Sequence, residues 1–532
     1  MAERSEFPMT YGGEVEMLTS ERGSGSLAPF DSEMRTMAQD AMRHIIDIDE
    51  KPISVDYDSS RHLIEIGAGV HNKLASLVHA LIEAISTLEV ILSRERRACL
   101  LSLSYHPVAD MDAAYENVLP KPMYDLWRGV YGGQHHLHPD VLPQVYPTNP
   151  EKGRGWQHKV TTLATSVQPW NSLPIEAASD QLAIIQATSW MFNLLTANSP
   201  FAGKKRTGKR DIRLEIWESM LGTSRYKGDS QLTSNLPMRP RGLTDYYRHV
   251  FGNQRIMAVP CVEVHTTGST SDYKKHFRAV MQPADDQEFS VLSYLNAESV
   301  SVVNIYTGEV QKIKPSVAHV FNGYDFLYFP RYGARLRVNL PQADRIDPKA
   351  FAHAILVGDD DLLQELFIQG GIRNGFICIE GRVPATVLPI HSRPGWKRFS
   401  IPFVLQTAIL RCSKEIFALL TSRGLTWPQL VEELPTKTND CRYGFKTSIQ
   451  DVHVTNLAQQ IWEIAKDSLS YEERELVGDE IDCILSRQKA PAEEQLDFVE
   501  EVSASTGDSI EDNTFARLID HFTAIVAHPL PV

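Results

Sequence analysis

Two hydrophobic periods alternate along the first part of the chain, and this mixture constrains its fold more than any other feature. Residues 11–20 and 61–67 have the short apolar alternations and runs that are typical of strands. Residues 32–48 and 71–96 repeat apolar side chains every three or four positions, as amphipathic helices do. The chain is therefore expected to combine strands and helices. Further strand patterns lie at 100–105, 161–168 and 300–306, and a further helix pattern lies at 175–196.

The composition is that of a soluble globular protein. Hydrophobic residues make up 42% and charged residues 23% of the 532 positions, which excludes wholesale disorder and fibrous repeats. Lys and Arg number 53 against 67 Asp and Glu, so the net charge is −14. Such a chain lacks the long-range basic field that attracts nucleic acid or an anionic membrane, and neither is expected as a partner. An anionic ligand would need arginines or metal ions gathered at one site.

The sequence also carries no targeting or cross-linking signals that we recognise. There is no apolar run of about 18 residues, which disfavours a transmembrane helix, and the charged start Met1–Glu6 is no secretory signal. The six cysteines are scattered and include no Cys-x-x-Cys pair, so reduced thiols are expected instead of disulfides or a zinc site. These observations predict a cytoplasmic protein.

The organisation of the chain changes near residue 345. We expect a short tail at 1–10, one large domain at 11–345 and a mainly helical region at 346–532. Within the helical region, segments 354–370 and 408–424 share one template, 54 residues apart. Ankyrin repeats are about 33 residues long and an array needs about three of them, so two similar helical hairpins are predicted instead.

Three glutamates lie within strand patterns. Glu14 and Glu16 are two positions apart and therefore point to the same face of their strand. Like charges this close repel unless they are solvated, hydrogen-bonded or bridged by a cation such as Mg²⁺. A solvated strand face is the alternative. Glu65 stands among apolar residues, so it either faces outward or binds a cation, because an unpaired buried carboxylate is costly.

The sharpest charge signal is a basic loop. Six cations fall within residues 204–213, after an apolar helix that ends at Asn198 and before Arg213 and Trp217. In an acidic chain this loop could hold a phosphate or a carboxylate, with arginine as the bidentate partner. A solvated charge run or a localisation signal is the alternative. The six cations are Lys204, Lys205, Arg206, Lys209, Arg210 and Arg213.

A histidine-rich insert lies between residues 133 and 140. His135, His136, His138 and Asp140 could together bind a transition metal. Such clusters are more often solvent-exposed loops, and the two interpretations stay open.

The motifs, and the order in which they follow one another along the chain, resemble the glutamate–cysteine ligase family, in the branch of plant-type enzymes, actinobacterial homologues and carboxylate–amine ligases. The resemblance covers residues 10–345 in patches, and the ordered set carries it more than any single motif. The matching segments are Gly13–Glu16, Leu63–Ala68, Tyr105-His106-Pro107, Pro120-Lys121 with Tyr124, Thr165–Gln168, and Ala197–Phe201 followed by Gly203, Gly208, Arg213 and Trp217.

The resemblance implies an α+β fold, in which a six-stranded antiparallel sheet with a glutamine synthetase-like core curves around a cleft and is flanked by helices. It implies an ATP-dependent ligase that joins a carboxylate to an amine through an acyl phosphate, with glutamate and a γ-glutamyl bond as the specific case. ATP and Mg²⁺ would be the cofactors, and an amino acid and an amine acceptor the substrates. By position, the metal ligands would be Glu14, Glu16 and Glu65; the catalytic residues Arg213 and Arg337; the substrate-binding residues Arg213, Trp217 and Asn198; and the cofactor-binding residues Lys204, Lys205, Arg210 and Gln168.

Two departures from the family pattern keep other functions open. The late Leu-Glu-x-Arg strand of the family is nearest to residues 332–337, where Arg337 fits but Arg335 replaces the acid. After the matching segment Thr165–Gln168, Pro169-Trp170-Asn171 also departs from the family pattern of that strand. One alternative is an enzyme of ligase origin that acts on a peptide or carrier protein docked on region 346–532. Another is a non-catalytic relative that binds a nucleotide or a partner. A homo-oligomer is compatible with all of these.

Overall fold

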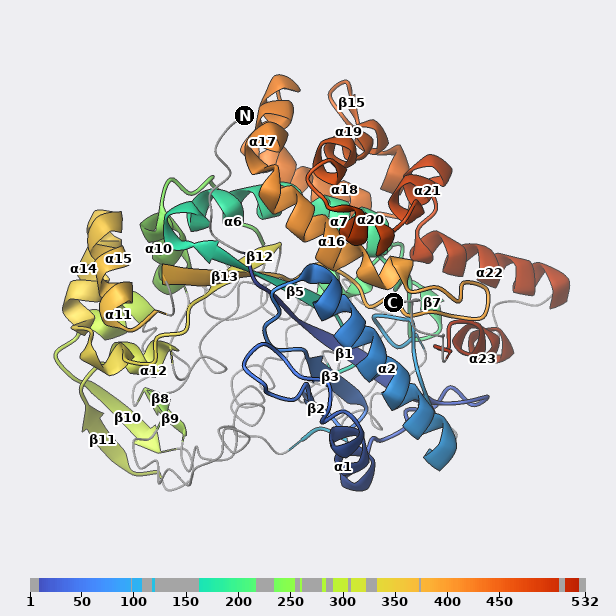
Figure 1. Cartoon of the computed structure of the whole chain (residues 1–532), viewed down its shortest axis with the longest axis horizontal. Coiled ribbons are helices and arrows are strands. Elements are labelled where there is room, and N and C mark those ends of the chain that lie inside the picture. Colours follow the sequence, from blue (N-terminus) through green and yellow to red (C-terminus); the bar gives the residue numbers. More distant parts are fainter. Residues whose placement is uncertain are drawn as a thin grey trace.

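A large antiparallel sheet runs through the middle of the molecule (Figure 1). Its strand order is β12-β13-β5-β1-β3-β2, and β4 pairs with the far end of β1. The strands are β1 (Tyr11–Glu21), β2 (Ser54–Tyr57), β3 (Leu63–Gly67), β4 (Ala98–Leu100), β5 (Val167–Pro174), β12 (Ala334–Arg337) and β13 (Phe376–Gly381). This computed structural model describes residues 9–96, 98–107, 117–119, 162–216, 234–253, 259–260, 280–283, 290–304, 308–321, 333–372, 375–506 and 512–525.

The expected mixture of helices and a large antiparallel sheet is confirmed, with seven strands in the sheet instead of six. The expected strands at 11–20 and 61–67 correspond to β1 and β3, whereas the strand expected at 161–168 begins only at Val167. The cleft and the likeness to the glutamine synthetase core stay predictions.

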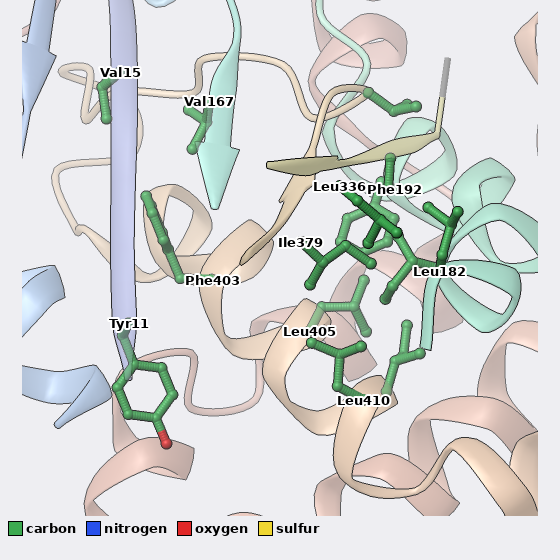
Figure 2. Close-up of a cluster of buried hydrophobic side chains, with 14 of the residues drawn as sticks. Tyr11, Val15, Val167, Leu182, Phe192, Leu336, Ile379, Phe403, Leu405 and Leu410 are labelled. Atoms are coloured by element: carbon green, nitrogen blue, oxygen red, sulfur yellow. The ribbon is translucent and has the colours of Figure 1, made fainter. Parts of the chain in front are cut away.

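One face of the sheet is apolar and is covered by helices α2 (Leu74–Arg96), α6 (Ala178–Ala187) and α16 (Lys397–Arg411). Alternation along each strand produces this face, since every second side chain points to the same side. Figure 2 shows Val15, Ile379 and Phe403 among the side chains of this core. Helix α16 passes so close to β1 that a Cβ on Gly13 would lie 2.7 Å from the Phe403 ring.

Helix α2 is long and apolar enough to cross a membrane by length and composition alone. Its segment Leu74–Arg94 has a mean hydropathy of 1.7, although polar residues interrupt its apolar run. Buried residues make up 61% of that window, and the helix packs against α1 (Ser32–Ala41), β1 and β4. In this structure it is a core helix.

Two expected helices show how local chemistry sets the boundaries. Asp31 caps the start of α1, because its carboxylate accepts a hydrogen bond of 2.9 Å from the Met34 amide. The single helix expected at 175–196 is divided at Thr188 into α6 and α7 (Ser189–Thr196), after a 3₁₀ turn η1 (Ile175–Ala177).

A smaller lobe lies to the left of the large sheet in Figure 1. Its four-stranded sheet has the order β11-β10-β9-β8, and an aromatic cluster joins the helices beside it. The strands are β8 (Val259–Pro260), β9 (Val280–Pro283), β10 (Val300–Asn304) and β11 (Val310–Ile313). The helices are α10 (Leu243–Asn253), α11 (Val291–Asn296), α12 (Val317–Phe321), η3 (Ala343–Arg345), α14 (Pro348–Val357) and α15 (Asp360–Gln369).

The region after residue 345 is mainly helical, but it also supplies β13 to the interior of the large sheet. The two similar hairpins of the sequence correspond to α14–α15 and α16–α17. The further elements are α17 (Ser413–Ser422), η5 (Gln429–Glu433), α18 (Leu434–Asn439), η6 (Gly444–Lys446), β14 (Ser448–Ile449), β15 (Val452–His453), α19 (Val454–Lys466), α20 (Tyr471–Glu475), α21 (Glu480–Arg487), α22 (Pro491–Thr506) and α23 (Asp512–His521).

The cysteines of the described ranges are free thiols. Cys99, Cys378, Cys412, Cys441 and Cys483 form no disulfide with one another, and Cys261 lies outside these ranges.

Candidate active site

The face of the large sheet opposite α2, α6 and α16 carries most of its charged side chains. Strand pairing places these residues in rows, because directly paired residues of neighbouring strands point to the same side. Glu16 pairs with Glu65, Glu14 with Gln168, and Glu380 with both Trp170 and Arg335. We call this surface the polar face; it comprises Asp56, Glu65, Glu14, Glu16, Gln168, Trp170, Glu380, Arg382, Arg335 and Arg337.

Carboxylates occupy the half of the polar face on β1, β3 and β2. The backbone amide of Glu16 donates to the Ser166 carbonyl on the side of β5 and therefore not toward β3. Glu16 and Glu65 thus form a non-hydrogen-bonded pair, the kind of pair in which side chains of antiparallel strands lie closest. Burial, reinforced by the charge of Asp58, raises the pKa of Glu16 to about 7. Burial also raises the pKa of Glu14. In the acidic half, burial therefore disfavours the ionised forms of Glu14 and Glu16.

The opposed pair Glu16 and Glu65 is compatible with Mg²⁺. Within the described ranges no three Asp, Glu, His or Cys side chains converge as metal ligands, so Glu14, Glu16 and Glu65 share a face without forming a three-ligand cluster. Mg²⁺ is usually held by one or two carboxylates and several waters, and two facing carboxylates suffice for that. A divalent cation would also relieve the repulsion of two like charges on opposed residues.

Three arginines surround one buried carboxylate in the other half of the polar face. Glu380 is fully buried and lies 2.8 Å from Arg335 Nε, 3.4 Å from Arg337 Nη1 and 2.6 Å from Arg382 Nη1. Burial alone would raise the pKa of Glu380, but the charges of the three arginines lower it to about 2. Glu380 is therefore ionised, and this half keeps an excess of positive charge.

Two side chains connect the acidic and basic halves. Gln168 donates from Nε2 to Glu16 over 2.7 Å, and its Oε1 accepts a hydrogen bond from Arg382. The Arg337 guanidinium lies 4.3 Å from the centre of the Trp170 ring and 3.7 Å from the nearer Glu14 oxygen. Glu14 and Glu16, which were expected to bind a metal, therefore lie on the same surface as Arg337 and Arg382.

Glu380 and Arg382 are functional candidates that were not predicted from the sequence. The acid-x-Arg pattern expected at 332–337 is present at Ile379-Glu380-Gly381-Arg382, on the strand next to β12. Arg335 therefore stands beside the acid and pairs with it instead of replacing it. The signal was available in the continuous apolar run Phe376–Ile379, but it lay in a region expected to be mainly helical.

Two arginines of the basic loop, Arg210 and Arg213, have extensive contacts inside the protein, and their expected binding roles stay predictions. Arg210 is fully buried, is held by both oxygens of Glu493 over 2.6 and 2.9 Å, and donates to two backbone carbonyls. Arg213 is 4% exposed, pairs with Asp211, and donates to the carbonyls of Thr165 and Val383. Each guanidinium thus uses four of its five N–H donors inside the protein, and these contacts contribute to the stability of the fold.

The remaining predicted residues divide between the interior, the surface and the ranges outside the description. Asn198 is fully buried, and its side-chain amide hydrogen-bonds to the backbone of Ser102, Ser104 and Thr386. Its side chain is therefore not accessible to a substrate in this structure. Lys204 and Lys205 are exposed on a separate two-stranded hairpin. Outside the described ranges lie Pro120, Lys121, Tyr124, Trp217 and the insert with His135, His136, His138 and Asp140.

Comparison with known proteins gives distant structural likenesses only. No protein family and no curated protein matches the sequence. The chain is similar to the glutamate–cysteine ligase of Francisella tularensis in complex with AMP, at 12% identity and a TM-score of 0.48, covering 97% of this chain and 92% of that one. It is also similar to a bifunctional glutathione synthetase from Pasteurella multocida, at 11% identity and a TM-score of 0.43, and spans about half of that protein (51%). At these scores the polar face of the chain itself has to carry the functional argument.

Proposed function

We propose that the protein is an ATP-dependent carboxylate–amine ligase whose active site lies on the polar face of its large sheet. One observation carries this proposal: carboxylates and guanidinium groups are segregated on two halves of a single sheet face and are joined through Gln168. A reaction between a nucleotide, a carboxylate and an amine needs both a cation site and a site for anions.

The acidic half is suited to the metal–nucleotide part of the reaction. Glu16 and Glu65 would hold Mg²⁺ together with waters, and Glu14 stands in the adjacent row. A bound magnesium ion supplies neutralisation of phosphate charge. Glu16 contributes by giving up its proton, because burial has raised its pKa to about 7 and the metal-bound form is ionised.

The basic half is suited to the carboxylate substrate. Arg337 and Arg382 are partly exposed, at 26% and 18% of their side chains, and Glu380 fixes both guanidinium groups in place. There they can orient a carboxylate for attack on the γ-phosphorus of ATP. The new O–P bond forms as the bond to ADP breaks, which gives an acyl phosphate. The amine then attacks the acyl carbon, phosphate leaves, and the nitrogen loses a proton. Glutamate as donor, and hence a γ-glutamyl product, is the specific case that the sequence motifs favour.

ADP release tests the proposal directly. We expect release that requires Mg²⁺, one amino acid with a free carboxylate, and an amine acceptor. Glu65→Gln should abolish this turnover and leave the far-ultraviolet circular dichroism spectrum unchanged. Glu298→Gln, a change at a side chain that is 87% exposed, is the control and should turn over normally. Full turnover by Glu65→Gln would disprove the assignment of Glu65.

The same assay separates the alternatives. ADP release that depends on a peptide or protein would favour the enzyme with a macromolecular substrate. No ADP release under any condition, together with no ATP binding in a separate titration, would favour the non-catalytic relative that binds a partner, a hypothesis suggested by Arg335 in place of an acid. This hypothesis has less support in the structure, because Arg335 pairs with Glu380 and the polar face therefore retains a carboxylate beside it.

A further inference from the structure

The outward half of the basic loop has no role in the proposed function. Arg210 and Arg213 turn into the protein, whereas Lys204, Lys205 and Arg206 are exposed and Lys209 is partly exposed. Arg442 and Lys446, from a loop far along the sequence, are exposed as well. We call the six outward cations, Lys204, Lys205, Arg206, Lys209, Arg442 and Lys446, the basic surface.

The hairpin and the loop of the basic surface lie side by side. Strands β6 (Phe201–Ala202) and β7 (Lys205–Arg206) are joined by Gly203 and Lys204, both with positive φ (54° and 61°), as a tight two-residue hairpin turn requires. The amide of Cys441 donates to the Gly208 carbonyl over 2.9 Å, and Lys209 forms a β-bridge with Asp440. Cations separated by more than 200 residues in sequence are thus brought onto one surface.

The base of this surface is rigid. The Arg210 guanidinium, buried beneath the hairpin, is held by Glu493 of α22 and lies 4.9 Å from the centre of the Phe445 ring. The Arg210 amide donates to the Asn439 carbonyl over 2.7 Å, which ties the hairpin to the loop from below. A partner would therefore meet a surface that is already ordered, which reduces the entropy lost on binding.

The basic surface carries more positive charge than its neighbours neutralise. Carboxylates of the described residues pair with Arg206 (Glu500, 2.9 Å), Lys209 (Glu215, 2.7 Å) and Arg442 (Asp440, 2.6 Å), and Lys204 has a contact of its own. In the described part of the chain no carboxylate lies within 4.0 Å of Lys205 or Lys446. An uncompensated basic patch is unusual in a protein whose net charge is −14.

We propose that the basic surface docks an acidic polypeptide segment of a partner protein. The chain itself shows the mode of contact, because Glu493 and Glu500, about two turns apart on one side of α22, meet Arg210 and Arg206. Exposed ion pairs such as Arg206–Glu500 contribute little to stability, so a partner can extend or displace them. Tyr443 is 47% exposed beside Arg442 and adds apolar area to the contact.

This docking site does not depend on the proposed ligase activity, and binding tests it without turnover. A fluorescent glutamate peptide of roughly ten residues is titrated with the full chain at low ionic strength and followed by anisotropy. We expect K205E/K446E to weaken binding about tenfold, and each single change about threefold. The control K73E/K414E alters charge equally at two other exposed lysines and should change the affinity less than about twofold.

Each outcome decides the proposal. Binding that is weakened by K205E/K446E alone, and that falls as salt is raised, supports it. Absence of binding, or equal weakening in both double variants, overturns the basic surface as the site. Tighter binding of an equally charged thymidylate oligonucleotide overturns the polypeptide as partner. If the double variant does not fold, the two single variants give the same comparison.

Discussion

At the scale of the residue, Glu380 is the side chain on which the basic half of the polar face depends. It is fully buried and pairs with Arg335, Arg337 and Arg382. Removing one partner of a buried ion pair leaves charge uncompensated, which typically costs about 3–5 kcal/mol. We therefore expect Glu380→Gln to lower the free energy of unfolding by about that amount, as measured by urea denaturation.

The pH dependence of stability checks the same residue. Because the arginines lower the pKa of Glu380 to about 2, its stabilisation is present above the ordinary carboxyl pKa of 4.5 and is lost as the pH falls toward 2. Glu380→Gln should remove this part of the acid-induced loss, whereas Glu298→Gln should keep it. An unfolding free energy unaltered by Glu380→Gln would contradict the ion-pair description.

Glu16 has the opposite shift and predicts the opposite behaviour. Its pKa is raised to about 7, so in the absence of a cation its contribution to stability falls as the pH rises from 4.5 through 7. Mg²⁺ binding should release protons, and its affinity should rise as the pH is raised through about 7. Calorimetric titration in buffers of different ionisation enthalpy measures this release, and Glu16→Gln should eliminate it. Equal affinity on both sides of pH 7 would argue against Glu16 as a ligand.

Single residues differ in how far their sequence surroundings reveal them. The position of Glu14 and Glu16 on one face follows from the two-residue period of a strand, and the structure has them there. Glu65 joins them only through the register of β3 against β1, which its own surroundings in the sequence do not reveal. The burial of Arg210 and Arg213 could not be predicted in this way. Arg210 is held by Glu493, almost 300 residues later, and nothing near the basic loop indicates that partner.

At the scale of the element, β13 is a strand of the large sheet that the sequence did not predict, although Phe376–Ile379 is a short apolar run. It has six residues, lies between helices in sequence, and gains its place only by pairing with β5 and β12 from distant parts of the chain. Helices were easier, since α1 and α2 follow a period set by neighbouring residues. The break between α6 and α7 was missed because Thr188, whose hydroxyl bonds to the Ile184 carbonyl over 2.8 Å, reads as an ordinary helical position.

The close approach of β13 to α16 gives a prediction for this element. A Cβ on Gly381 would lie 2.4 Å from Gln406 Oε1 and 3.2 Å from Pro169, and Gln406 is itself fully buried. Gly381→Ala should therefore destabilise the protein by about 1–3 kcal/mol through overpacking. Gly395→Ala is the matched control, because no atom lies within 4 Å of its added Cβ. Similar melting temperatures for the two variants would show that α16 can move away from the sheet.

At the scale of the whole molecule, the region after residue 345 is joined to the sheet as well as to its own helices. It supplies β13 between β5 and β12, α16 against the apolar face, and the Glu493 that holds the basic loop. The expected boundary near 345 marks a change in helix content, and strand pairing crosses it.

A fragment of residues 1–345 tests this crossing. It would lack the strand between β5 and β12 and would expose the core residues Leu173, Val167 and Leu336 to water. We expect it to lose the cooperative thermal transition of the full chain and to bind a hydrophobic dye, as loosely packed states do. Circular dichroism melting and dye fluorescence measure both properties, with the full chain as the control. A fragment that melts cooperatively and binds no dye would show that residues 11–345 fold alone. In that case β13 would be an addition to a complete sheet, and the pairing of Glu380 with three arginines would be secondary to the site.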